Sequence, residues 1–342
     1  MAEIMASMSP ARHKKELARA DRVLPGAWRL RLPLPWPGVP HVNAWAIAAG
    51  SGIVLVDTGL HEPGAMRQLE LALDQAGLKL EHVRLLVCTH AHSDHYGLAA
   101  PIVEATGCEL WMHPKHAHMT QAAEDPERML ERRLEVARQS GVPPDTLAGY
   151  ESSRRGGGVG VAGVVLPDRD LVDGVELETD LGAWRVYETP GHAPSHVVLH
   201  QPDRRLLLSG DHIIGRVSLY YDYGYTPDPA GEFLSSLDVV EPLDVQLVLS
   251  GHGRPRRDFK ALVAANRKAV LERVEIVRRE LASGPRTPYD IVPSLFGDGA
   301  PRQLMVSWGL SEVLCYLRYL ELREEAAPVD GEEEPARWQA PA

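Results

Sequence analysis

The chain has 342 residues, of which 44% are hydrophobic, and its formal net charge at pH 7 is −11. This length suits one large domain with a small addition, and the acidic charge disfavours nucleic acid as a partner, because phosphate contacts need a basic surface. The sequence holds no run of eighteen apolar residues, so we expect neither a transmembrane span nor a membrane partner. The three cysteines are widely spaced in apolar contexts, which indicates buried, reduced thiols and a cytoplasmic location.

Residues 1–22 lack the apolar core and the small-residue cleavage site of a signal peptide, and we interpret them as a flexible leader of mixed charge. Residues 36–43 are interpreted as part of a pocket wall. A strand is predicted at residues 53–56, which are apolar and β-branched, and it ends at Asp57. Because a Thr-Gly pair follows, Asp57 also fits an ordinary turn aspartate.

Residues 83–88 predict a short buried strand. The loop that follows packs four potential metal ligands into six positions: His90, His92, Asp94 and His95. Imidazole and carboxylate groups bind zinc-like divalent ions. The two histidines that lie two apart on an extended segment point the same way, whereas the Asp-His pair falls past the bend and can face a second position. The pattern therefore predicts a metal site on a loop at the end of a strand.

Residues 114–160 form an insertion that is rich in helix-forming residues and ends in a glycine-rich break. We interpret it as a helical hairpin over the edge of the site, and a surface elaboration without substrate contact is the alternative. Three histidines stand at its start: His113, His116 and His118. Their spacing could bind metal, but we interpret them as part of a polar, helical stretch without that role.

Three further predicted strands, residues 184–189, 206–209 and 245–250, each run into a glycine, the first by way of Pro190. Directly after these glycines stand three more potential ligands: His192, Asp211 and His252. Glycine lets the backbone turn sharply and approach an ion closely. Other histidines nearby are interpreted as structural: His196, His200 and His212. In total, five strand-to-loop junctions carry His or Asp in an α/β background.

Taken in order, these five junctions resemble the motifs of the metallo-β-lactamase superfamily of hydrolases, over about residues 23–256. The resemblance implies an α/β fold, a four-layer αββα sandwich with a two-metal site on one edge. It implies that a first ion is bound by His90, His92 and His192. It assigns to the second ion Asp94, His95 and His252. Asp211 would bridge the two ions, and Asp57 would orient the ligand loop.

The resemblance also implies two divalent ions, with zinc preferred and iron or manganese as alternatives. A metal-bridging hydroxide would then attack a carbonyl, with Asp94 and Asp211 as the catalytic carboxylates. The G-x-S-x-G elbow of the α/β-hydrolases is absent, so a serine nucleophile has little support. We expect a thioester or lactone of a small molecule, as in the glyoxalase II-like branch. The alternatives are a phosphodiesterase or ribonuclease with the same site, and a mononuclear iron persulfide dioxygenase.

After Asp211 comes a loop with four tyrosines that we interpret as a substrate pocket: Tyr220, Tyr221, Tyr223 and Tyr225.

Residues 257–323 predict a helical domain, with Asp258 as the cap of a long first helix and Thr287 as the cap of the next. This array of helices resembles the winged-helix-like domain that is appended to one branch of the superfamily. We expect this domain to cover the sandwich or to form a homodimer. The acidic, proline-rich residues 324–342 predict a disordered tail.

Overall fold

The computed structural model describes residues 17–222, 224–297, 299, 301–329 and 334–341, and its first half is built on a seven-stranded mixed sheet. The strands follow one another in chain order: β1 (Arg19–Leu24), β2 (Ala27–Trp36), β3 (Val39–Ala49), β4 (Gly52–Val56), β5 (Val83–Cys88), β6 (Glu109–Met112) and β7 (Arg169–Asp170). The first four strands pair antiparallel, and β4 to β7 pair in parallel.

A second sheet has the order β12-β11-β10-β9-β8. Its strands are β8 (Glu176–Thr179), β9 (Gly182–Glu188), β10 (Val197–Gln201), β11 (Leu206–Gly210) and β12 (Leu247–Ser250). Because β10 is antiparallel to both of its neighbours and β12 is parallel to β11, three of these strands run the same way. The carboxyl ends of β9, β11 and β12 therefore share one edge of the sheet.

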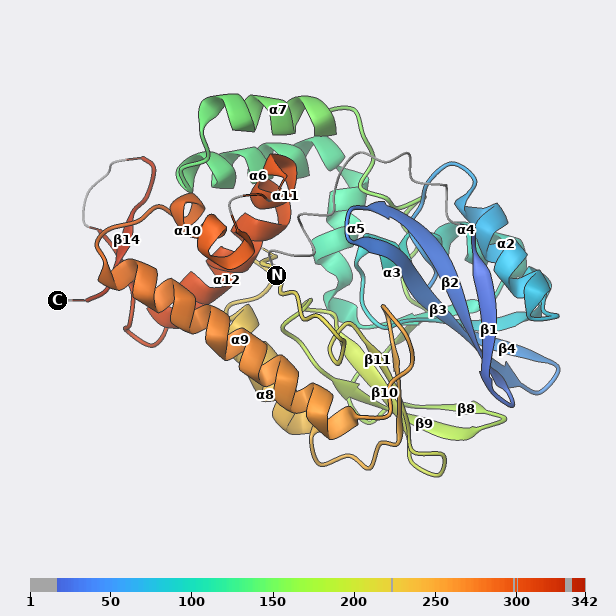
Figure 1. Cartoon of the computed structure of the whole chain (residues 1–342). Coiled ribbons are helices and arrows are strands. Elements are labelled where there is room, and N and C mark those ends of the chain that lie inside the picture. The colour runs from blue at the N-terminus through green and yellow to red at the C-terminus, as the bar shows by residue number, and fades with distance from the viewer. Residues whose placement is uncertain (1–16, 223, 298, 300, 330–333, 342) are drawn as a thin grey trace.

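Side chains alternate along the strands and divide the core into layers. In β4, Ile53 and Leu55 join the cluster beneath helices α2 (Ala65–Gln75) and α4 (Ala99–Thr106), whereas Val54 and Val56 face the second sheet. In the second sheet, alternate residues of β10, β11 and β12 pack between the sheets or outward against α8 (Pro229–Val240) and α9 (Phe259–Ala282). The predicted α/β fold, a four-layer αββα sandwich, is thereby confirmed. Figure 1 shows these layers.

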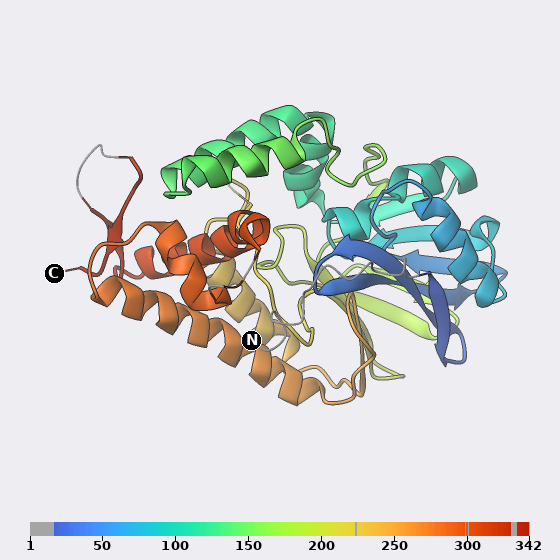
Figure 2. The ribbon, with the colours of Figure 1, turned by 45° about the horizontal axis from the view of Figure 1, so that its top comes forward.

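The insertion contains more helices than the expected hairpin. A 3-10 turn η2 (Pro114–His116) leads into α5 (Ala117–Glu124), α6 (Pro126–Gln139) and α7 (Pro144–Arg154). Asp125 caps α6, since its side chain accepts a hydrogen bond from the backbone N–H of Arg128, and Pro126 occupies the first helical position. Figures 1 and 2 show α6 and α7 beside the C-terminal helices, away from the exposed edge of β1. Shorter helical turns elsewhere are η1 (Leu80–His82) and α3 (Ser93–Tyr96).

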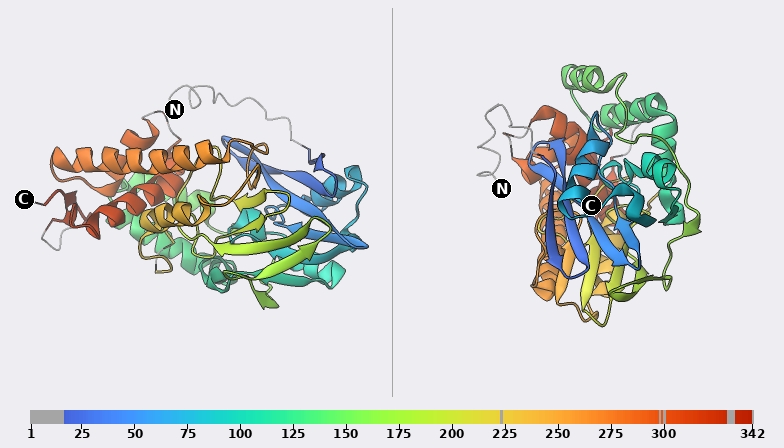
Figure 3. Two further views of the ribbon diagram at one scale, coloured as in Figure 1. Left: turned by 90° about the horizontal axis from the view of Figure 1, so that it is seen from below. Right: turned by 90° about the vertical axis from the view of Figure 1, so that its right-hand side faces the viewer.

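The C-terminal region begins with the long helix α9, which extends from the second sheet to the far end of the molecule (Figure 1). Four shorter helical elements follow: α10 (Pro288–Phe296), α11 (Arg302–Leu304), the π-helical η3 (Met305–Gly309) and α12 (Leu310–Glu321). Thr287 caps α10 with a capping box that includes Asp290, as the sequence predicts. Asp258 stands before α9 but caps nothing, because its carboxylate pairs with Arg256 instead. Figure 3 shows the sheets at one end and these helices at the other.

Both predicted terminal segments need correction where the structure describes them. Within 324–342, β13 (Ala327–Pro328) pairs antiparallel with β14 (Trp338–Gln339), and Trp338 also exchanges two backbone hydrogen bonds with Arg286. Disorder is therefore wrong for these residues, because the tryptophan packs on the core and its backbone finds partners. Residues 330–333 and 342 lie outside the described residues.

The leader, predicted as residues 1–22, also overlaps the first strand. Residues 1–16 lie outside the described part of the chain, but β1 begins at Arg19 and Ala18 is buried. Two glutamine side chains of α2 accept hydrogen bonds from the backbone N–H groups of Ala18 and Ala20 and so hold this segment in place. Among the described residues, no helix is long and apolar enough to cross a membrane.

Candidate metal centre

The predicted ligands meet at one edge of the sandwich because their strands end there. Asp57 directly follows β4, and the His90–His95 loop follows β5, which is parallel to β4. Asp211 directly follows β11, and His252 follows the parallel strand β12. Two backbone hydrogen bonds, from Val197 to Thr89 and from Asn43 to Gly251, join the two sheets at this edge. The ligand loops of both sheets therefore face one another.

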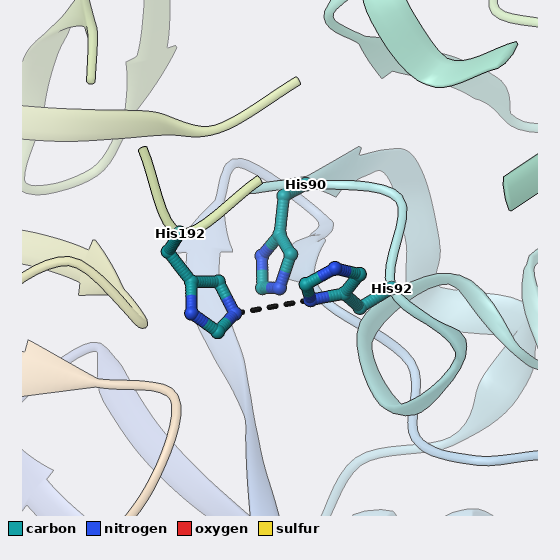
Figure 4. Close-up of side chains that lie close together, drawn as sticks. All are labelled: His90, His92 and His192. Atoms are coloured by element: carbon teal, nitrogen blue, oxygen red, sulfur yellow. Dashed lines mark hydrogen bonds between the residues drawn. The ribbon is translucent and has the colours of Figure 1, made fainter. Parts of the chain in front are cut away.

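The first group of side chains is His90, His92 and His192 (Figure 4). Nδ1 of His92 lies 3.0 Å from Nε2 of His192, and the ring centroids of His90 and His92 are 4.7 Å apart. Nδ1 of His192 donates a hydrogen bond of 2.7 Å to the carbonyl oxygen of Ser218. Its Nε2 is therefore the nitrogen that offers a lone pair to the group.

The second group is Asp94, His95 and His252. Nε2 of His252 lies 3.3 Å from Oδ2 of Asp94 and 3.3 Å from Oδ2 of Asp211. The carboxylate of Asp211 also faces the first group, since its Oδ2 is 3.6 Å from Nε2 of His192, while its Oδ1 is 3.5 Å from Nε2 of His95. Asp211 thus lies between the two groups, which is the position expected of a bridging carboxylate.

Several donor atoms of these groups are buried and have no hydrogen-bond partner: Nε2 of His90, Nε2 of His95, Oδ2 of Asp94 and Oδ1 of Asp211. Leaving polar atoms buried and unsatisfied costs free energy that a bound ligand can recover. Imidazole nitrogens and carboxylate oxygens that converge in this way fit divalent cations. Both groups of donors therefore suit a divalent cation.

In the rings of His90, His95 and His252, the nitrogen that points away from the group lies within hydrogen-bond distance of an oxygen atom. Asp57 accepts hydrogen bonds from Nδ1 of His95, at 2.9 Å, and from the backbone N–H of Thr89, at 2.8 Å. The Thr89 hydroxyl lies 3.0 Å from Asp57 Oδ2 and 3.1 Å from Nδ1 of His90. Nδ1 of His252 donates to the carbonyl oxygen of His41 at 2.9 Å. Such contacts fix ring orientation and tautomer.

A glycine is required where the backbone passes closest to these donors. A Cβ atom added to Gly251 would lie 2.2 Å from Oδ1 of Asp211 and 2.6 Å from Cε1 of His95. Gly210, which precedes Asp211, has a φ of 46° and an added Cβ there would lie 2.7 Å from Nε2 of His196. The glycines that the sequence places before ligand residues are thus matched by close approach at these two positions.

Burial and neighbouring charge give the two groups different protonation. Burial lowers the pKa of His192 to about 4 and that of His90 well below its usual value. In the second group burial acts in the same direction, but the carboxylates of Asp211 and Asp94 raise the pKa of His252 to about 10. Burial likewise opposes the charged form of His95, yet Asp94 and Asp211 raise its pKa well above the usual range. Without a cation, therefore, protons on these two rings balance the carboxylates.

A third group lies on the other side of His92. Nε2 of His92 is 3.8 Å and Nδ1 of His118 is 3.3 Å from Oδ2 of Asp222. His118, which the sequence interpretation left without a role near a metal, is thus placed beside a candidate ligand. Its other nitrogen lies 3.0 Å from the hydroxyl of Ser195. No local pattern indicates this contact, because α5 brings His118 to a loop a hundred residues further along.

The remaining predicted residues divide into two sets. His196 bonds through both ring nitrogens, to Thr189 and to the backbone N–H of Asp211, and His200 bonds to a backbone carbonyl, in keeping with structural roles. The ring of Tyr220 lies 5.7 Å from that of His92, and Tyr225 donates a hydrogen bond to Gln121. Tyr220, Tyr221 and Tyr225 all line one pocket. Tyr223 lies outside the described residues.

Comparisons with known proteins agree with this geometry. Residues 37–252 match the model of the metallo-beta-lactamase superfamily. The chain is 27% identical over 304 residues to the probable metallo-hydrolase YqjP of Bacillus subtilis (strain 168), a match that covers 86% of this chain and 92% of that protein.

Two solved structures resemble the chain over most of its length. The metallo-beta-lactamase family protein TTHA1429 from Thermus thermophilus superposes with a TM-score of 0.79 at 28% identity and covers 93% of this chain and 100% of that one. A beta-lactamase domain protein from Burkholderia ambifaria gives a TM-score of 0.76 at 27% identity and covers 94% and 93% respectively. Both similarities include the C-terminal helices, which lie beyond the family model.

Proposed function

Because the chain belongs to the metallo-β-lactamase superfamily, we propose that it is a hydrolase that uses two metal ions to cleave a small-molecule thioester or lactone. The coarser statement, a metal-dependent hydrolase, is supported by the similarity to a probable metallo-hydrolase. The observation that carries the finer one is the convergence of seven buried or half-buried donors into two groups that share Asp211. Zinc is the proposed metal, with iron and manganese as alternatives.

In this proposal each side chain has a definite task. His90, His92 and His192 hold one cation, and Asp94, His95 and His252 hold the other, with Asp211 shared between them. When bound, the pair of cations lowers the pKa of a water molecule and stabilises negative charge that develops on a carbonyl oxygen. In the metal-free protein, His95 and His252 hold the pKa values of the Asp94 and Asp211 carboxylates below the usual range despite burial. Bound cations would likewise keep both carboxylates ionised, so that they can accept hydrogen bonds from the attacking water.

Metal analysis and substrate turnover test this proposal together. We expect about two divalent ions per chain, and hydrolysis of generic thioesters or lactones in preference to bis-p-nitrophenyl phosphate. Cleavage of the phosphodiester alone would instead favour a phosphodiesterase or ribonuclease. A single iron per chain with oxygen uptake on a persulfide would favour a dioxygenase.

A matched pair of variants separates the site from general effects on folding. Asp211→Asn should lose bound metal and turnover together, because an amide cannot supply the shared negative charge. Asp74→Asn makes the same change on an exposed residue of α2 and should lose neither. Retention of both metal and activity by the Asp211 variant would contradict the shared role of this carboxylate.

Further features of the chain stay proposals. A cytoplasmic location is supported by the three cysteines, all of which are free and buried. We also propose a relationship to the glyoxalase II-like branch, with the C-terminal helices as a winged-helix-like appendage that covers the sandwich or forms a homodimer. Its ordered helices and the small β13–β14 sheet are compatible with that proposal. Size-exclusion chromatography with light scattering measures the oligomeric state directly.

A further inference from the structure

A pocket lies against the third group of side chains, next to the candidate metal centre. Three separate parts of the chain line it: helices α5, α6 and α7 of the insertion, the tyrosine loop after Asp211, and the region from η3 into α12. His118 and Asp222 belong both to this lining and to the group that contains His92. A molecule bound in the pocket would therefore reach toward the first metal group.

The pocket is lined by two arginine side chains that have no carboxylate close by in the described part of the chain. Arg132 and Arg133 both line it, and among the described residues neither guanidinium makes an ion pair within 4.0 Å. Arg133 is half-buried and lies near the hydroxyl groups of Tyr220 and Tyr150, whereas the Asp222 carboxylate acts on it only at longer range. That carboxylate is already shared by two histidines. Withdrawing a guanidinium from water without a counter-charge is unfavourable, so an anion would stabilise this arrangement.

The remaining walls of the pocket are apolar or phenolic. Four aliphatic side chains contribute from the insertion and from the C-terminal helices: Met129, Val136, Val306 and Leu310. Tyr150 and Tyr220 add aromatic surface, each with one hydroxyl. Mixed walls of this kind accept a short apolar chain, while the few polar groups fix its orientation. The two arginines would bind a negative charge at one end of that chain.

We propose that this pocket binds an anionic substituent of the substrate, a carboxylate or a phosphate carried on a short apolar chain, and that Arg133 is its principal contact. This inference rests on the proposed hydrolase function, because it assumes that the reacting carbonyl lies at the metal centre. The pocket and the metal centre adjoin each other, since the ring of Tyr220 in the pocket lies 5.7 Å, between centroids, from the ring of the candidate ligand His92. Planar guanidinium groups bind both anions through paired hydrogen bonds.

A matched set of thioesters tests the preference in the metal-loaded, full-length protein. S-phenyl thioesters of acyl chains from butanoyl to octanoyl are compared when the far end bears a methyl group, a carboxylate or a phosphate. We expect kcat/KM to be about tenfold or more higher for an anionic end, mainly through KM. The carboxylate and phosphate series then show which anion is preferred. In Arg133→Met, the ratio of anionic to neutral substrates should fall toward one.

Arg128→Met is the matched control, since Arg128 is an exposed residue of the same helix and does not line the pocket. It should keep the ratio of the unaltered protein. Binding of hexyl phosphate and hexanoate, measured by calorimetry, gives a readout that needs no turnover. If anion binding is lost in Arg133→Met and the protein hydrolyses neither thioesters nor lactones, the result supports the pocket and overturns the hydrolase proposal. If the protein hydrolyses anionic and neutral substrates with about equal kcat/KM, and both variants bind the anions equally, the pocket proposal is overturned and the hydrolase proposal stands.

Discussion

The two histidines of the second group show how buried carboxylates set the protonation of candidate metal ligands. Burial alone would keep both rings neutral, yet Asp211 and Asp94 raise the pKa of His252 to about 10 and hold the pKa of His95 well above its usual range. The charge of the metal-free group is thus neutralised internally. A cation must compete with these protons, because only neutral imidazole binds a metal.

This competition predicts proton release on metal binding. A group whose pKa lies above the working pH is protonated in the metal-free protein, so at pH 7 the binding of zinc should release roughly two protons, from His95 and His252. The apparent affinity should rise with pH up to about 10, where His252 loses its proton without a metal. Calorimetry in buffers of different ionisation enthalpy measures the number. His252→Gln should release about one proton fewer; equal release by both proteins would contradict the assignment.

At the scale of the element, the strand ends determine which residues can meet. β11 and β12 run in parallel, so the loops after them lie side by side and Gly251 packs against the side chain of Asp211. An added methyl group on Gly251 would lie 2.2 Å from a carboxylate oxygen, closer than any contact the structure can hold without a shift. The position of Asp211 therefore depends on a residue with no side chain.

We expect Gly251→Ala to displace Asp211 and His95 and to lower metal content to below about half, while far-ultraviolet circular dichroism keeps the helical signal. Gly215→Ala is the control, because Gly215 lies in the loop after β11 and an added Cβ there meets nothing within 4 Å. Metal content is measured after gel filtration at equal protein concentration. If the Gly251 variant binds as much metal as the Gly215 variant, the tight approach does not hold the site together.

The sequence predicts correctly those elements that depend on neighbouring residues alone. Strand β5 begins and ends where the apolar run predicts, and the capping box at Thr287 forms as its residue types indicate. The contact between His118 and Asp222 depends instead on how α5 packs against a distant loop. The hydrogen bond from His192 to the backbone carbonyl of Ser218 could not be predicted either, because every residue type carries such a carbonyl group. The acidic, proline-rich composition of residues 324–342 predicts disorder, but Trp338 packs against the core and so orders the segment around it.

At the scale of the whole molecule, the largest apolar cluster crosses the predicted boundary at residue 257. It includes Val248 of β12, Phe233 of α8, Val270 of α9 and Leu317 of α12 without interruption. Seven apolar side chains of α9 are buried in it: Phe259, Leu262, Val263, Val270, Val274, Val277 and Leu281. At about 1.5–3 kcal/mol each, their burial is comparable with the whole stability of a typical domain. The C-terminal helices and the second sheet therefore support one another.

A shared core predicts one unfolding transition in which the helices and the metal centre are lost together. Leu262→Ala should lower the free energy of unfolding by about 2–5 kcal/mol, because it opens a cavity in the cluster. Leu271→Ala removes the same atoms from α9 at a side chain that is 44% exposed and should change stability by less than about 0.5 kcal/mol. Thermal unfolding followed by circular dichroism and by release of a bound metal should give coincident midpoints in both variants. Helices that melt separately from the metal centre would instead show that α9 belongs to an independent domain.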